Sequence, residues 1–161
     1  MTGNRRLAFW VVVAVQAVVL LGMIGLNEQA LAHGERVTLR TAPVDPLDLF
    51  RGNYVALRYE ISNVQVPAGT HPGDTVYIPL SETGGVWRGS FGRRVPPSGE
   101  TFIRGTVRDV SDHTAHVQYG IETYYADEEE ARNLQDAGQL LVTVVLDDEG
   151  RARISRVEPV R

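Results

Sequence analysis

Three acidic residues are the strongest candidates for chemistry in this sequence. Asp45 and Asp48 could serve as a carboxylate pair in hydrolysis or bind a divalent cation, and Glu60 offers a third carboxylate after them. A structural interpretation competes with this one. With Asp45 as N-cap, Pro46 at the first helical position and Asp48 at the third, the segment would form a single helical turn whose carboxylates accept backbone N–H bonds. The sequence leaves both interpretations open.

Arg51 also has two interpretations. Its planar guanidinium could recognise an anionic group or a membrane partner, or it could form an ion pair with Asp45 or Asp48 that fixes the turn. Gly52 and Asn53 come next and predict a turn, because both residue types tolerate a positive φ.

From Tyr54 the alternation of residue types predicts a strand that runs to Ile61. The side chains expected to face the core are Val55, Leu57, Tyr59 and Ile61. Tyr54 and Arg58 fall on the opposite face, where a tyrosine ring can contact a guanidinium group. We take this segment as the candidate binding region and call it the motif surface. Its residues are Asp45, Asp48, Arg51, Gly52, Asn53, Tyr54, Arg58 and Tyr59.

Composition excludes several classes of chemistry. All 16 basic residues are arginine and cysteine is absent, which excludes a Schiff-base lysine, a Ser–Lys dyad, a thiolate nucleophile and a Cys-ligated metal. His113 and His116 are spaced as in some metal sites, but on a strand they would face opposite ways. Asp147, Asp148 and Glu149 lack EF-hand spacing and predict a polar hairpin turn instead. We expect no catalytic residues, no metal and no cofactor.

An apolar stretch runs from Leu7 to Leu26 and is interrupted only by Gln16, Gly22 and Gly25. A bilayer core of roughly 30 Å is spanned by about 20 such residues in a helix, so the stretch predicts a transmembrane anchor in the lipid bilayer. Gln16 either hydrogen-bonds a neighbouring transmembrane helix or is a tolerated single polar side chain.

The flanks of this stretch predict its orientation. Arg5 and Arg6 precede it, which by the positive-inside rule places residues 1–6 in the cytoplasm. Residues 7–26 would then cross the cell membrane, and residues 27–161 would form an extracytoplasmic domain.

A cleaved signal peptide is the alternative to a retained anchor. Ala30 and Ala32 give the small-x-small pattern of a cleavage site, and cleavage there would release a secreted domain that starts at His33. Residues 27–161 hold all 20 acidic residues and all but two of the arginines. Their net negative charge argues against a nucleic-acid partner.

Short apolar runs separated by Gly and Pro predict a mainly β (α+β) domain after the anchor. We expect a barrel or sandwich-like arrangement of about eight short strands with one short helix, near residues 128–137, capped by Asp127 and ended by Gly138. Glu130 occupies the capping-box position of that helix. The expected strands are Arg36–Arg40, Tyr54–Ile61, Thr75–Leu80, Val86–Phe91, Thr101–Asp109, His116–Ile121, Leu140–Leu146 and Arg151–Val157.

The segment around Tyr54 resembles the motif of the GDYXXLXY family of bacterial membrane-anchored proteins. Gly52, Tyr54, Leu57 and Tyr59 match the motif, and Asn53 replaces its aspartate. The preceding context matches in Pro43, Val44, Asp45, Pro46, Asp48, Leu49, Arg51 and Gly52. A second block resembles the family in Tyr119, Gly120, Ile121, Glu122, Tyr124, Tyr125 and Glu128.

This resemblance implies a partner in the cell envelope, because members of the family occur beside, or fused to, multi-spanning membrane proteins. It implies no established activity, and Asn53 would have lost any catalytic role of the aspartate. We therefore expect a non-enzymatic binding or assembly module at the inner membrane, with an integral membrane protein as partner. The alternative is an exported hydrolase or a small-ligand binder of cell-wall or carbohydrate material that uses Asp45, Asp48 or Glu60.

Overall fold

A computed structural model describes residues 9–19, 34–42 and 54–160 of the chain. The chain divides into two compact units, Met1–His33 and Gly34–Arg161. In the first unit residues 9–19 form a helix whose side chains are all exposed. Within the described ranges, no helix combines the length and the hydropathy that crossing a membrane requires. The ends of the expected anchor and the flank of residues 1–6 lie outside the described residues.

The second unit contains a three-stranded antiparallel sheet in the order β1-β9-β10. Its strands are β1 (Glu35–Arg40), β9 (Leu140–Leu146) and β10 (Ala152–Pro159). The expected polar hairpin joins β9 to β10: Asp147 Oδ1 accepts the backbone N–H groups of Glu149 and Arg151, at 3.0 and 2.8 Å. Valine and leucine side chains of β1 and β9 point into the core, which explains the near-continuous apolar sequence of β9.

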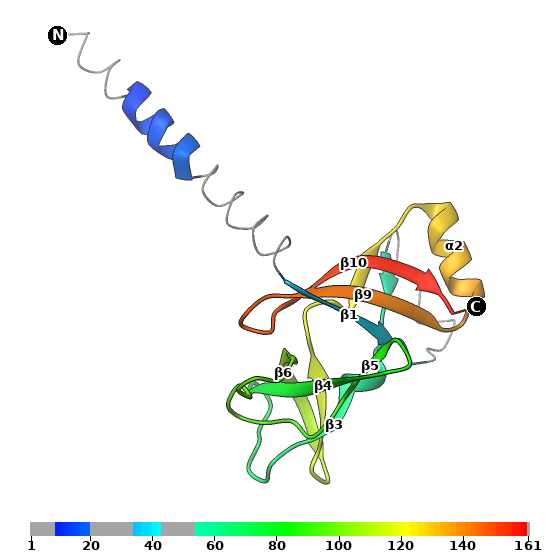
Figure 1. The fold of residues 1–161 in the computed structure, drawn as a ribbon. Helices are drawn as coiled ribbons and strands as arrows, with labels where there is room; N and C mark the ends of the chain where they lie inside the picture. The colour runs from blue at the N-terminus through cyan, green and yellow to red at the C-terminus, as the bar shows by residue number, and fades with distance from the viewer. Residues whose placement is uncertain (1–8, 20–33, 43–53, 161) are drawn as a thin grey trace, which may run out of the picture. The chain divides into compact units, whose positions relative to one another are not determined.

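A five-stranded antiparallel sheet in the order β3-β7-β6-β4-β5 forms the larger part of this unit (Figure 1). Its strands are β3 (Asn63–Gln65), β4 (Thr75–Thr83), β5 (Val86–Gly89), β6 (Phe102–Ser111) and β7 (Thr114–Gln118).

The five-stranded sheet curls into a nearly closed barrel-like structure. The chain that leaves β5 links the two sides: Arg93 pairs with Tyr77 of β4, and the Gly92 N–H donates to the carbonyl of Gln65 in β3 at 2.8 Å. These bonds satisfy backbone groups that would otherwise form an open sheet edge.

A two-stranded antiparallel sheet connects these parts. It pairs β2 (Tyr54–Ala56) with β8 (Thr123–Tyr125). Helix α2 (Glu128–Asp136) follows β8 and lies beside β10 (Figure 1). Asp127 caps it as expected, because its Oδ1 accepts the N–H groups of Glu129 and Glu130, and Gly138 ends it at a φ of +68°. Glu130 was expected to complete a capping box. Its carboxylate instead accepts a hydrogen bond from the Tyr124 hydroxyl, at 3.0 Å.

The mainly β class is confirmed, but the expected strand Tyr54–Ile61 is wrong. Strand β2 ends at Ala56, and a 3-10 turn, η2 (Glu60–Ser62), replaces its second half. The turn forms because Ser62 Oγ accepts the Tyr59 N–H while the Ser62 N–H donates to the Tyr59 carbonyl. The described residues hold ten strands rather than about eight, since β3 and β8 were not expected.

Candidate functional site

The structure brings the two family-like sequence blocks side by side. In the β2–β8 pair, Tyr54 lies opposite Tyr125 and Ala56 lies opposite Thr123. The pairing continues past β2, where the Leu57 N–H donates to the Glu122 carbonyl at 2.8 Å. Two segments that are distant in sequence therefore form one structural unit.

The hydroxyl groups of Tyr59 and Tyr119 lock the two blocks together. Tyr59 donates to the carbonyl of Ile121 at 2.7 Å, and Tyr119 donates to the carbonyl of Ile61. Both side chains are buried, Tyr59 to 1% exposure and Tyr119 to 6%. We call this reciprocal pair of hydrogen bonds the tyrosine clamp.

Glu122 organises the turn beside the clamp. Its carboxylate oxygens accept the N–H groups of Tyr119, at 2.6 Å, and Gly120, at 2.9 Å. Burial raises the pKa of the Tyr59 and Tyr119 hydroxyls above the ordinary range of tyrosine, and the negative charge of Glu122 raises both further. Both hydroxyls therefore stay protonated and available as donors in neutral solution.

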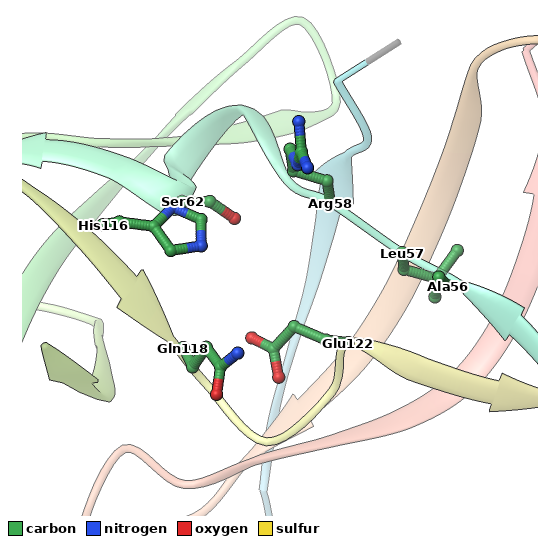
Figure 2. A pocket seen from close by; sticks show the side chains of 7 residues that line it. All are labelled: Ala56, Leu57, Arg58, Ser62, His116, Gln118 and Glu122. Atoms are coloured by element: carbon green, nitrogen blue, oxygen red, sulfur yellow. The ribbon is translucent and has the colours of Figure 1, made fainter. Parts of the chain in front are cut away.

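A cavity of about 190 Å³ opens between the two blocks (Figure 2). We call it the motif cavity. Its lining combines a piece of the first block with residues of η2, β7 and the second block: Ala56, Leu57, Arg58, Ser62, His116, Gln118 and Glu122.

The polar side chains of the motif cavity are fixed by neighbours. His116 Nδ1 lies 3.1 Å from Asn63 Oδ1, across the β3–β7 pair. Gln118 Oε1 accepts the Arg108 Nε–H at 2.6 Å. The Arg58 side chain is exposed at the rim, and its guanidinium makes no hydrogen bond or ion pair with another described residue. The cavity therefore has a polar wall held by neighbouring side chains and one cationic group without a partner among the described residues.

The structure places the expected motif surface only in part. Asp45, Asp48, Arg51, Gly52 and Asn53 lie outside the described residues, so the capping turn and its alternatives stay predictions. Tyr54 lies on β2, and its side chain, with the expected tyrosine–guanidinium contact, is also outside what is described.

Two other candidates of the motif are placed clearly. Arg58 lies at the rim of the motif cavity, whereas Tyr59 is a core residue whose hydroxyl is used by the clamp. The expected alternation of burial holds even though the strand does not: Leu57 and Ile61 are buried with Tyr59, and Arg58 is exposed.

Of the remaining candidates in the β domain, His116 lines the motif cavity. Glu60 is exposed on η2 and does not line it, and Gln16 is exposed in the helix of residues 9–19. His113 lies in the β6–β7 turn at a φ of 67°, and His116 lies on β7. Within the described ranges, no three His, Asp or Glu side chains gather as a metal site would require.

Sequence reasoning missed Ser62, Gln118 and Glu122 as neighbours of Arg58. Glu122 carried a signal, because it belongs to the second block. Ser62 and Gln118 carried none, since neither lies in a block and only the folded sheet brings them to Arg58. His116 was considered only as a metal ligand, whereas its observed partner is an amide.

Fold and site together define a mainly β protein with a barrel-like sheet, in which two paired sequence blocks enclose a polar cavity. The model of the GDYXXLXY protein family matches residues 16–157. The chain belongs to this family. No curated protein and no solved structure matches the chain.

Proposed function

We propose that the chain is an extracytoplasmic binding or assembly module, anchored in the bacterial inner membrane by its N-terminal segment and partnered with a multi-spanning membrane protein. The helix of residues 9–19 carries this proposal. All of its side chains except Gln16 are apolar, and all are exposed, with Trp10 at 66% and Val18 at 68%. A helix that is apolar on every side is typical of a buried or membrane-spanning segment.

The length and flanks of the apolar stretch support the same proposal. The sequence continues without a charge from Leu7 to Leu26, about the number of residues needed to cross a bilayer. Arg5 and Arg6 favour a cytoplasmic N-terminus. This orientation places the β domain on the far side of the membrane.

Gln16 supports a partner within the membrane. It is the only polar side chain in the helix of residues 9–19. In a hydrocarbon environment an amide gains about 1 kcal/mol by hydrogen-bonding a polar group on a neighbouring helix. Ala14 and Ala17 flank it and allow such a helix to approach closely.

On the β domain, Arg58 is the best-placed residue of the motif surface for contact with the partner. It is exposed and free of ion pairs with the described residues, so its guanidinium is available to an acceptor on another protein. Tyr59 is not available for this contact, because its side chain is buried and its hydroxyl donates to the Ile121 carbonyl.

A second candidate function is small-ligand binding, and the motif cavity favours it. A hydrolase has less support, because Glu60 belongs to the lining of none of the described cavities and Asp45 and Asp48 lie outside the described residues. The ligand chemistry of the motif cavity is developed in the next subsection.

Affinity purification of the full-length chain from membranes in mild detergent, followed by mass spectrometry, tests the proposal. We expect a stoichiometric multi-spanning protein to copurify. Arg58→Ala should reduce the yield of this copurifying protein. Gln16→Leu should also reduce the yield, because it removes the polar group available to a neighbouring transmembrane helix. Arg88→Ala is the matched control, since Arg88 is an exposed arginine on β5 outside the motif cavity.

Recovery of the chain alone from intact membranes would contradict the proposal of a partner. N-terminal sequencing of the mature chain tests the anchor separately. A mature protein that starts at His33 would contradict a retained anchor and support a secreted domain.

A further inference from the structure

The acceptor atoms of the motif cavity are largely used by the protein itself. Gln118 Oε1 accepts Arg108 Nε–H, and Ser62 Oγ accepts the Tyr59 N–H at 3.1 Å. The two carboxylate oxygens of Glu122 each accept one backbone N–H. Each of these four oxygen atoms therefore already accepts one hydrogen bond from the protein.

The donor groups, in contrast, have no partner among the residues that the structure describes. The Gln118 amide keeps both N–H bonds of its NH₂ group, and Figure 2 shows that nitrogen on the side facing Glu122 while the oxygen points away. The Ser62 hydroxyl keeps its hydrogen, since its oxygen acts as the acceptor for Tyr59. Arg58 adds a guanidinium that no described residue pairs with.

His116 is oriented so that one ring nitrogen remains for a ligand. Its Nδ1 lies 3.1 Å from Asn63 Oδ1, which leaves Nε2 for a ligand. The lining thus offers hydrogen-bond donors from Gln118, Ser62 and Arg58, and its two charged side chains, Arg58 and Glu122, have opposite sign.

We infer that the motif cavity binds a carboxylate group, presented by a small molecule or by the C-terminal residue of a polypeptide. A carboxylate has only acceptor atoms and matches the planar guanidinium of Arg58 in a two-point contact. The Ser62 hydroxyl and the Gln118 NH₂ group are further donors of the lining, the latter on the side of Glu122. This inference does not depend on a membrane partner.

The negative charge of Glu122 does not prevent this arrangement. Its two short hydrogen bonds from backbone N–H groups hold the carboxylate against its own turn. Arg58 and Glu122 lie on opposite sides of the cavity in Figure 2, so a ligand carboxylate at Arg58 is separated from Glu122.

The size of the cavity limits the ligand. A volume of about 190 Å³ equals about six water molecules at about 30 Å³ each. This space accepts a carboxylate with a small side chain such as that of alanine, while the remainder of a longer ligand would extend into solvent past Arg58.

Nuclear magnetic resonance on the ¹⁵N-labelled full-length chain in detergent micelles tests the inference. The probes are the peptide N-acetyl-glycyl-glycyl-alanine with a free carboxylate, the same peptide as its C-terminal amide, and acetate. We expect the free acid to shift the Gln118 side-chain NH₂ and the Arg58 Nε–H signals saturably, and the amide to leave them in place.

Two variants and a control sharpen this test. Arg58→Gln should weaken binding of the free acid by about tenfold or more, because it removes the charge-assisted hydrogen bonds. Gln118→Glu keeps an acceptor for Arg108 but replaces the NH₂ donor with a carboxylate, and should abolish binding. Arg88→Gln changes the net charge equally, away from the cavity, and should leave the affinity unchanged.

Each outcome decides the question. Shifts with both the peptide acid and acetate support a general carboxylate site, and shifts with the peptide acid alone support a polypeptide C-terminus. Equal binding of acid and amide, no saturable shift with any probe, or equal effects of Arg58→Gln and Arg88→Gln would overturn the inference. Because no partner protein is present, its failure is distinct from failure of the proposed assembly function.

Discussion

Tyr59 and Tyr119 each donate a hydrogen bond to the carbonyl group two residues after the other tyrosine. The Tyr59 hydroxyl reaches Ile121, and the Tyr119 hydroxyl reaches Ile61. The same Tyr-x-Ile pattern thus appears in both blocks and is used in the same way. In this chain the last tyrosine of the motif, Tyr59, therefore helps to join two segments that are distant in sequence.

Removal of either hydroxyl should destabilise the fold. Tyr59→Phe or Tyr119→Phe leaves a buried carbonyl without its partner, which costs about 1–3 kcal/mol of the free energy of unfolding. Urea unfolding of the full-length chain in micelles measures this loss. Tyr77→Phe is the control, since Tyr77 packs its ring on Phe102 and this contact survives the change. Equal losses in all three variants would contradict the clamp.

The clamp also predicts sensitivity to alkaline pH. In the unfolded chain both tyrosines ionise near their ordinary pKa of 10.0, whereas in the folded protein burial and Glu122 raise the pKa and keep them protonated. Stability is therefore full below pH 10 and falls as the pH rises above it, by about 1.4 kcal/mol per pH unit for each tyrosine.

Unfolding free energies measured between neutral pH and pH 11 should follow this slope. Tyr59→Phe should remove the contribution of one tyrosine and make the slope shallower. An identical slope in the wild type and in Tyr59→Phe would show that Tyr59 does not contribute to the pH dependence.

Glu122 should stabilise the turn through both carboxylate oxygens. Glu122→Gln replaces one acceptor oxygen with an NH₂ group, which cannot accept the N–H of Tyr119 or Gly120. We expect a loss of about 1–3 kcal/mol in the free energy of unfolding. Glu60→Gln, an exposed position on η2, should change it by less than about 0.5 kcal/mol. A silent Glu122→Gln would contradict the assigned role.

Gly105 should not tolerate a side chain. It lies on β6 behind the clamp, where an added Cβ would clash with Val117 and come within 2.9 Å of the Tyr119 ring. Gly105→Ala should therefore lower the thermal midpoint through overpacking that costs about 1–3 kcal/mol. Ser81→Ala at an exposed position of β4 is the matched control. A Gly105→Ala chain as stable as the control would show that the Tyr119 ring can move.

Sequence alone predicted those parts of the fold that local patterns determine. The Asp147 hairpin, the Asp127 cap and the alternating burial of Leu57, Tyr59 and Ile61 each follow from neighbouring residues. The strand Tyr54–Ile61 failed because a 3-10 turn and a strand can bury the same alternate side chains over so few residues. The sequence predicted the alternation of buried and exposed side chains correctly, but it did not predict the backbone conformation.

Of the residues that line the motif cavity, the sequence predicted only Arg58 as a binding residue. Arg58 was identified from the alternation of residue types after Tyr54, but its cavity neighbours Ser62, His116 and Gln118 come from other elements of the fold. Strands β3 and β8 are three residues each, too short to produce a periodic signal. Strand β3 pairs with β7, which carries His116 and Gln118, and β8 pairs with β2 beside Arg58. Pairing between distant segments cannot be read from periodicity in one sequence.

The distance along the chain between paired elements sets the order of events when the protein is made. Tyr59 and Ile121 are 62 residues apart, and β1 must wait for β9, which follows still later. At a synthesis rate of about 5–20 residues per second, the first block remains unpaired for about 3–12 seconds. The core therefore cannot be completed progressively from its N-terminal end. It closes late, once β8 and β9 have been synthesised, and until then β1 and β2 lack their pairing strands.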